Sequence, residues 1–202
     1  MFDDRVERLK SKSPGKLIIK EYPTASAHSG HFKALLNELA LKKSFKPDVL
    51  FIDYLNICAS SRFKGGNISS YFYIKAIAEE LRGLAVEFKL PIFTATQTTR
   101  SGFVSTDIGL EDTSESFGLP ATADFMFALM TSEELDSLNQ MKVKQLKNRY
   151  SDPAINRSFI IGVDRSKMRL YDVEQKAQNI VDANQEKKVE VDPYDKFSDF
   201  KV

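Results

Sequence analysis

The sequence predicts an α/β domain with a mainly parallel sheet and an antiparallel C-terminal extension, on three observations. Two stretches, 31–43 and 70–89, repeat apolar residues at the spacing of helices that bury one face. Short apolar runs typical of strands lie at 49–52, 91–96 and 124–130. Shorter β-rich segments follow residue 141. Alternating strands and helices predict the parallel sheet, and the later segments predict antiparallel strands added to it.

The N-terminal part predicts two helices and a strand. Residues 2–12 are charged and weakly amphipathic, which predicts a short helix that ends at Ser13-Pro14-Gly15. Residues 17–19 are apolar and predict a short strand that ends at Pro23. The second helix has apolar residues at positions i, i+3, i+4 and i+7, namely Phe32, Leu35, Leu36 and Leu39.

The central part predicts three strands around one long helix. Val49 to Ile52 form a continuous apolar run directly before Asp53, which predicts a strand buried on both faces. Residues 70–89 carry the clearest amphipathic pattern of the chain. The apolar runs 91–96 and 124–130 predict two further strands, of which the second is also expected to be buried.

The residue pattern changes in the C-terminal third. Three segments alternate polar and apolar residues or are rich in β-forming residues: 142–149, 158–163 and 168–173. Residues 174–202 are dominated by Gln, Asn, Lys, Asp and Glu, which predicts a mobile tail. We therefore expect one domain over residues 1–173 and a flexible tail over 174–202.

Composition narrows the class of protein. The formal net charge is +1, which argues against a polybasic protein but leaves room for a local nucleic-acid site. The single cysteine, Cys58, excludes an internal disulfide and is typical of a reducing compartment. The charged N-terminus is unlike a signal peptide, and no apolar run approaches the ~18–20 residues of a membrane span. We expect a cytoplasmic protein with no membrane partner.

Two polar residues follow predicted strands at positions suited to phosphate chemistry. Asp53 ends one strand, where a carboxylate can hold Mg²⁺ through water beside nucleotide phosphates. Gln97 follows the next strand, where an amide can sense a γ-phosphate or orient water. Each residue alone has an ordinary alternative, because many strands end in a turn or capping aspartate and many loops carry a glutamine.

Basic residues form two candidate nucleic-acid or phosphate contacts. The stretch 141–170 has eight basic and two acidic residues, a local charge of +6, and includes Lys147 and Arg149. It is either a solvated strand face or a basic hairpin that reaches a polyphosphate or nucleic acid. The loop around Arg62 and Lys64 mixes basic, aromatic and glycine residues, which suits single-stranded DNA but is also compatible with a plain surface loop.

Four motifs together resemble the DnaB-type replicative helicases, most closely those of T-even-type phages. VLFIDYL resembles the Walker B motif, TQTTR resembles a Ser-Gln-x-x-Arg motif, ESFGLPATAD resembles the fourth motif, and KNR resembles a Lys-x-Arg element. These motifs occupy residues 49–55, 96–100, 115–124 and 147–149. Their order and spacing agree with the family, and the similarity extends from about residue 16 to about residue 172.

The resemblance implies a RecA-like P-loop ATPase core that uses ATP and Mg²⁺. Asp53 would hold Mg²⁺ beside the nucleotide, and Gln97 would couple the γ-phosphate to the DNA-facing loops. Arg149, aided by Lys147, would act as an arginine finger on the nucleotide of a neighbouring subunit. Three basic residues would contact single-stranded DNA, namely Arg62, Lys64 and Arg100. The implied partners are single-stranded DNA, further copies of the chain in a hexameric ring, and candidate replisome proteins such as primase.

The sequence departs from the family pattern in two places. The 202 residues contain no G-x-x-x-x-G-K-[ST] phosphate-binding loop, and the strand with the family's catalytic glutamate is also absent from them. We therefore expect the C-terminal part of such an ATPase domain, inactive by itself. Ser114 stands where cellular members carry an arginine before the Glu-Ser pair, so no DNA contact is expected there. The alternatives are a non-catalytic nucleic-acid or partner-binding module and a RecA-type recombinase core, and the Asp-Tyr-Leu and Thr-Gln-x-x-Arg pairing favours the helicase.

Overall fold

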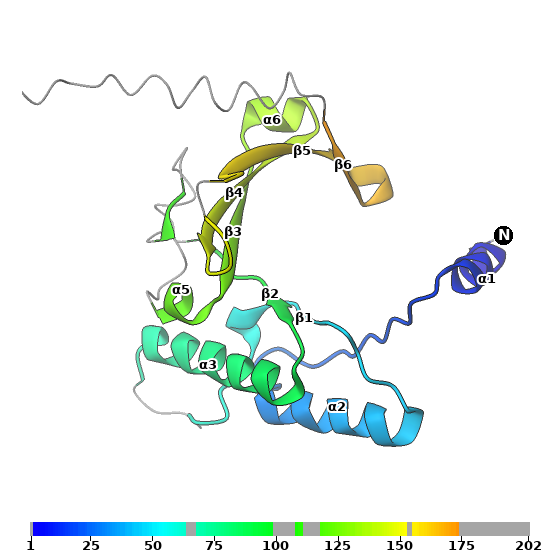
Figure 1. Ribbon diagram of the computed structural model, residues 1–202, viewed down its shortest axis with the longest axis vertical. Helices are drawn as coiled ribbons and strands as arrows, with labels where there is room; N and C mark the ends of the chain where they lie inside the picture. The colour runs from blue at the N-terminus through cyan, green and yellow to red at the C-terminus, as the bar shows by residue number, and fades with distance from the viewer. Residues whose placement is uncertain (1, 64–67, 99–107, 111–117, 153–154, 174–202) are drawn as a thin grey trace, which may run out of the picture.

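A computed structural model of the chain describes residues 2–63, 68–98, 108–110, 118–152 and 155–173 (Figure 1). Three predictions lie outside these residues: the tail 174–202 and the roles of Lys64 and Arg100. The position of Ser114 lies outside them as well.

The three predicted helices are confirmed. They are α1 (Phe2–Lys12), α2 (Ser29–Lys43) and α3 (Ser70–Phe88), and the structure adds the short helices α5 (Gly118–Thr122) and α6 (Glu133–Ser137). Single 3₁₀ turns lie at Leu55–Ile57 and Arg165–Lys167. In the described part of the chain, no helix is long and apolar enough to cross a membrane.

The strand predicted at 17–19 is wrong. This segment has no strand pairing in the structure, and the side chains of Leu17 and Ile19 are 81% and 84% exposed. An apolar triplet forms a stable strand only where a partner strand and a packing surface meet it, and the segment runs outside the core. It links α1, which lies apart from the other elements, to α2 (Figure 1).

The strands form two sheets. They are β1 (Leu50–Ile52), β2 (Ile92–Thr94), β3 (Phe125–Met130), β4 (Gln140–Asn148), β5 (Ser158–Asp164) and β6 (Arg169–Asp172). The pair β1–β2 is parallel, and β3-β4-β5-β6 is an antiparallel sheet in that order. The antiparallel pairing predicted for the C-terminal segments is therefore confirmed, but among the described strands they form a sheet of their own with β3 and do not extend the parallel pair. Of the strands that the structure describes, β2 pairs only with β1, and β3 pairs only with β4.

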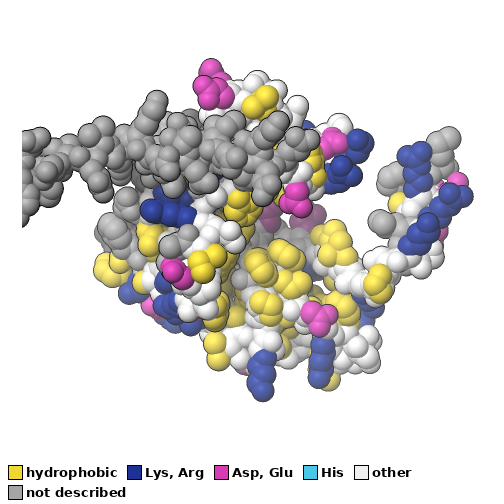
Figure 2. Space-filling model, turned by 45° about the horizontal axis from the view of Figure 1, so that its top comes forward, with side chains coloured by type: hydrophobic (Ala, Val, Ile, Leu, Met, Phe, Trp, Pro, Cys, Tyr) yellow, Lys and Arg dark blue, Asp and Glu magenta, His cyan; other side chains and the backbone are white. Residues whose placement is uncertain are grey.

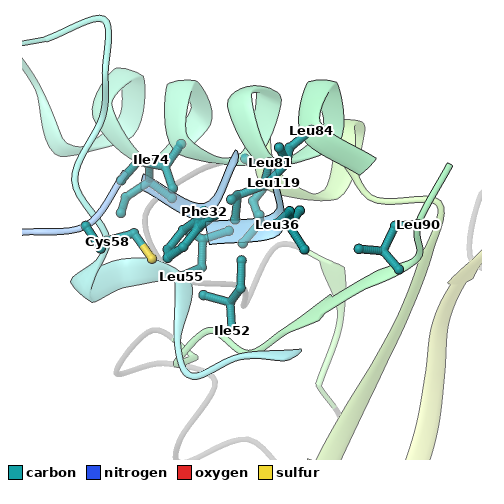
Figure 3. Packing of buried hydrophobic residues seen from close by; sticks show 13 residues of the cluster. Phe32, Leu36, Ile52, Leu55, Cys58, Ile74, Leu81, Leu84, Leu90 and Leu119 are labelled. Carbon is teal, nitrogen blue, oxygen red and sulfur yellow. The ribbon is translucent and has the colours of Figure 1, made fainter. Parts of the chain in front are cut away.

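The main core lies between the β1–β2 pair and the helices α2 and α3. Ile52 at the end of β1 and Leu55 just after it point into this core (Figure 3). Helix α3 contributes Ile77, which is 1% exposed. Burying a side chain of this size contributes about 1.5–3 kcal/mol relative to leaving it in water. This packing fixes the strand ends that carry the candidate site.

The prediction that the strand at 49–52 is buried on both faces is wrong, and the strand at 124–130, predicted to be buried, is buried only in part. Phe51 is 70% exposed and stacks on Phe93, which is 48% exposed, with ring centroids 5.3 Å apart. Phe125 and Phe127 of β3 are 45% and 48% exposed. Hydrophobic side chains accordingly reach the surface in Figure 2. The reason is that helices α2 and α3 cover only one face of β1–β2, so alternate strand residues remain uncovered.

Candidate functional site

Asp53 and Gln97 lie beyond the carboxyl ends of two neighbouring parallel strands. Ile52 of β1 is opposite Thr94 of β2, so Asp53 follows the last residue of β1 and Gln97 lies three residues past the end of β2. Both side chains are exposed. Ligands of open α/β sheets bind at this edge of the strands, so the arrangement expected from the sequence is present at the level of the backbone.

Three hydrogen bonds fasten the two strand ends to each other. The Thr94 hydroxyl donates to the Ile52 carbonyl at 2.9 Å, and the Leu55 amide donates to the carbonyl of the alanine after Thr94 at 3.1 Å. The Thr96 hydroxyl donates to Oδ1 of Asn56 at 2.8 Å. Sequence reasoning did not single out Thr96 or Asn56, although the Thr-Gln motif contains the first of them. These bonds hold the segments that carry Asp53 and Gln97 in a fixed relation.

The Asp53 carboxylate suits an outer contact to a hydrated cation. No hydrogen bond or ion pair to another described residue occupies it. The described residues contain no group of three or more His, Cys, Asp or Glu side chains placed to hold a metal ion. A single carboxylate binds Mg²⁺ in proteins mainly with the help of water and nucleotide phosphates. Asp53 therefore fits a site of that kind, and does not fit one in which protein side chains supply all the ligands.

Lys147 and Arg149 lie together where β4 runs beside the C-terminal end of α5. The Lys147 ammonium donates to the Pro120 carbonyl at 2.5 Å, and the Arg149 Nη2 donates to the Ala121 carbonyl at 2.9 Å. The Arg149 Nη1 also donates to Oδ1 of Asp124 at 2.9 Å. The C-terminus of a helix presents unpaired carbonyl groups and the negative end of the helix dipole, which explains why Lys147 and Arg149 both bind there.

A third cation, Arg82 of α3, shares the Asp124 carboxylate. Its Nη1 donates to Oδ1 of Asp124 at 2.7 Å and to the Thr122 carbonyl at 2.6 Å. The hydrogen bond from Arg82, with a further one from Arg149, holds the pKa of Asp124 below its ordinary value against the opposing effect of burial. Burial and the neighbouring Arg149 lower the pKa of Lys147. Three cations around one carboxylate leave this cluster with excess positive charge, which suits an anionic ligand.

Arg62 lies in a third place, at the start of the loop that precedes α3. Its Nη1 is 2.5 Å from Oε2 of Glu79. The next residue of α3, Glu80, accepts hydrogen bonds from Ser29, Ser60 and Ser61. The roles of Glu79 and Glu80 were missed, because two adjacent acids on an amphipathic helix look like an ordinary solvated face.

Comparison with known proteins identifies a helicase as a relative of this chain. A DnaB-like replicative helicase of Enterobacteria phage T4 is 43% identical over 175 residues, which cover 86% of this chain. The chain spans only 37% of the length of that relative. No protein-family model matches the chain. The resemblance inferred from the four motifs is confirmed by this relative.

Two solved structures share the fold. One, an ATPase domain, superposes with a TM-score of 0.62 at 18% identity, covering 73% of this chain and 52% of that chain. The other, a DnaB-like replicative helicase solved in a study of its interactions with primase, has a TM-score of 0.61 at 19% identity and covers 73% and 36%. The fold is that of RecA-like helicase ATPase domains, which confirms the predicted fold class.

Proposed function

We propose that this chain, a relative of the DnaB-like replicative helicases, forms part of an ATPase core that couples ATP hydrolysis to translocation on single-stranded DNA and unwinding of the duplex. One observation carries the proposal. In a chain 43% identical to a replicative helicase, Asp53 and Gln97 lie at the carboxyl edge of two adjacent parallel strands. The same identity favours a helicase over a recombinase core or a non-catalytic binding module.

Asp53 and Gln97 would serve the nucleotide. Asp53 would hold Mg²⁺ through water, and Mg²⁺ would supply charge neutralisation on the phosphates of ATP. Gln97 detects the γ-phosphate through its amide and passes the change along the loop that follows β2. The hydrogen bonds of Thr94 and Thr96 support this role, because they hold the ends of both strands together during the change.

Arg149, with Lys147 beside it, would act on the nucleotide bound by a neighbouring subunit. A guanidinium has five donors in a planar fork, and Asp124 and Ala121 engage only Nη1 and Nη2 once each. The side chain is 43% exposed, so its remaining donors can face a phosphate. The hydrogen bonds to Asp124 and to the Ala121 carbonyl of α5 keep the guanidinium in one orientation. This role requires a ring, which we propose to be a hexamer of the intact protein.

Single-stranded DNA would run past the loop that carries Arg62, with Lys64 and Arg100 as further phosphate contacts. A basic loop with aromatic neighbours binds the sugar-phosphate backbone without reading the sequence. Primase and other replisome proteins are the candidate protein partners. The primase interaction of a solved helicase with the same fold supports that part of the proposal.

The proposal is tested with a chimera in which this chain replaces the matching segment of the phage T4 relative. We expect the chimera to hydrolyse ATP, to respond to single-stranded DNA and to unwind a forked duplex. Asp53→Asn and Gln97→Ala should each lower kcat, while circular dichroism and ring assembly on native gels stay unchanged. A chimera that assembles into rings but neither hydrolyses ATP nor unwinds DNA would contradict the proposal.

A further inference from the structure

The loop root that carries Arg62 is fixed to α3 by Glu80. The Ser61 amide donates to both carboxylate oxygens of Glu80, at 3.0 and 2.9 Å, and the Ser61 hydroxyl donates to one of them at 2.7 Å. The Ser60 hydroxyl donates to the other oxygen at 2.6 Å, and the Ser60 side chain is buried. The backbone that leads into Arg62 is therefore held at a set place on the helix.

This anchor determines where the Arg62 side chain rests. The Arg62 amide donates to the Ser60 hydroxyl oxygen at 3.2 Å and to Oε1 of Glu80 at 3.3 Å. Its guanidinium then reaches Oε2 of Glu79, the residue just before Glu80 on α3, at 2.5 Å. The basic group proposed to meet DNA is thus already paired with a carboxylate of its own chain.

Glu79 has a second cation that remains when Arg62 leaves. Its other oxygen, Oε1, lies 3.9 Å from the ammonium of Lys75, one helical turn earlier on α3. The Arg62–Glu79 pair is half exposed on the arginine side, and exposed pairs of this kind are weak. A phosphodiester offers the same planar guanidinium at least as good a set of acceptors.

We propose that Glu79 is an intramolecular competitor of DNA: it occupies Arg62 in the free chain and yields it to a phosphodiester of single-stranded DNA. The inference rests on the proposed DNA-binding function of this loop. In the free state Glu79 neutralises Arg62 and so weakens contacts with stray polyanions. On binding, Arg62 exchanges one anion for another while Glu79 keeps Lys75 as its partner.

The test measures binding of the full 202-residue chain to fluorescein-labelled oligothymidylate by fluorescence anisotropy over a range of salt concentrations. Four variants are compared with the wild type: Glu79→Gln, Arg62→Gln, the double variant, and Glu87→Gln. Glu87 is the matched control, because it lies on the same helix and pairs with Lys33 at 2.6 Å with similar exposure. Its removal changes the net charge by the same amount.

Glu79→Gln should tighten binding about 2- to 5-fold, the range expected for release of one exposed ion pair. Arg62→Gln should weaken binding and reduce the slope of log K against log salt by about 0.7, the loss of one contact to a single strand. The double variant should bind like Arg62→Gln, because Glu79 acts only through Arg62. Glu87→Gln should stay within about 1.5-fold of the wild type, since most of its charge effect is screened by salt.

Two results would overturn the role of Glu79 as a competitor and leave the proposed role of Arg62 in DNA binding standing. One is an Arg62→Gln variant that binds more weakly beside a Glu79→Gln variant that binds like the wild type. The other is a gain from Glu79→Gln that persists without Arg62 or is matched by Glu87→Gln, which would show a general charge effect. If Arg62→Gln leaves affinity and salt slope unchanged, or if the wild type does not bind the probe at all, the proposed role of Arg62 in DNA binding falls, and the inference with it.

Discussion

Replacing Glu80 by glutamine should destabilise the hydrogen bonds that hold Ser60 and Ser61, just before Arg62, on α3. The expected free-energy change follows from the pKa of Glu80. Burial alone would raise the pKa of the Glu80 carboxyl, but hydrogen bonds from Ser60, Ser61 and Ser29 outweigh it and lower the pKa from 4.5 to about 2. Without any correction for solvent screening, that pKa difference corresponds to about 3.4 kcal/mol of stabilisation of the charged carboxylate. The carboxylate is partly exposed, and solvent screening reduces the value to about 1–1.5 kcal/mol.

The assay is hydrogen–deuterium exchange at the Ser61 amide, which donates to both Glu80 oxygens. At pH 7 the Glu80→Gln variant should exchange this amide about 5- to 13-fold faster than the wild type. The pKa of Glu80 is lowered by folding, so its contribution is complete above pH 4.5 and is lost as the pH falls through about 2. The ratio of the two rates should therefore shrink to about 2- to 3-fold at pH 3.

Two results would refute this reasoning. If the two proteins exchange the Ser61 amide at the same rate at pH 7, the Glu80 hydrogen bonds contribute nothing to the anchor. If the ratio is large but equal at pH 7 and pH 3, the effect is due to the altered shape of the side chain and not to its charge. Glu87→Gln serves as the control and should leave exchange of this amide within about 2-fold, because its surface pair with Lys33 is weak.

The isolated chain should not hydrolyse ATP, because its 202 residues contain no phosphate-binding loop; release of phosphate at ~1–10 s⁻¹ that Asp53→Ala abolishes would contradict this. The isolated chain should also self-associate as its concentration rises, since Phe51 and Phe93 are exposed on β1 and β2, which pair only with each other among the described strands. Sedimentation velocity should show less association for Phe51→Ser, and a monomer at all concentrations would be the contrary result. In the chimera, Asp124→Asn should lower kcat and change KM less, because Asp124 orients Arg149 without binding ATP. A change in KM as large as the change in kcat would count against that role.

Patterns local to one element predicted much of the fold. The spacing of apolar residues gave the extent of α2 and α3 to within about two residues. Asp53 and Gln97 could be placed at one edge because the chain direction of neighbouring parallel strands determines where both end. Burial could not be predicted in the same way. The apolar run at β1 looked doubly buried, yet the exposure of Phe51 depends on which elements cover each face.

Contacts between distant residues left no signal in the sequence. Arg82 meets Asp124 across 42 positions, and Arg62 meets Glu79 across 17, so neither pair belongs to one helix or strand pattern. Asp124 was at least part of a recognised motif, whereas Arg82 looked like an ordinary polar residue of an amphipathic helix. The tertiary fold, which brings α3 beside both the loop and α5, is what creates these pairs.

Mixing two inactive variants tests whether Arg149 completes the nucleotide site of a neighbouring subunit. Chimeric subunits with Arg149→Ala are mixed with chimeric subunits that lack the lysine of the phosphate-binding loop. Arginine fingers contribute a factor of about 10³–10⁵ to kcat, so each variant alone should hydrolyse almost no ATP while it still forms rings.

If Arg149 acts on the neighbouring subunit, mixed rings recover part of the ATP hydrolysis, because some interfaces join an intact phosphate-binding loop to an intact Arg149. Recovery should rise and fall with the mixing ratio and be greatest when both variants are abundant. Native gels must show mixed rings in the same samples. Mixed rings that never regain hydrolysis at any ratio would contradict a role of Arg149 at the neighbouring site, and would assign it to its own subunit's site or to the support of α5 alone.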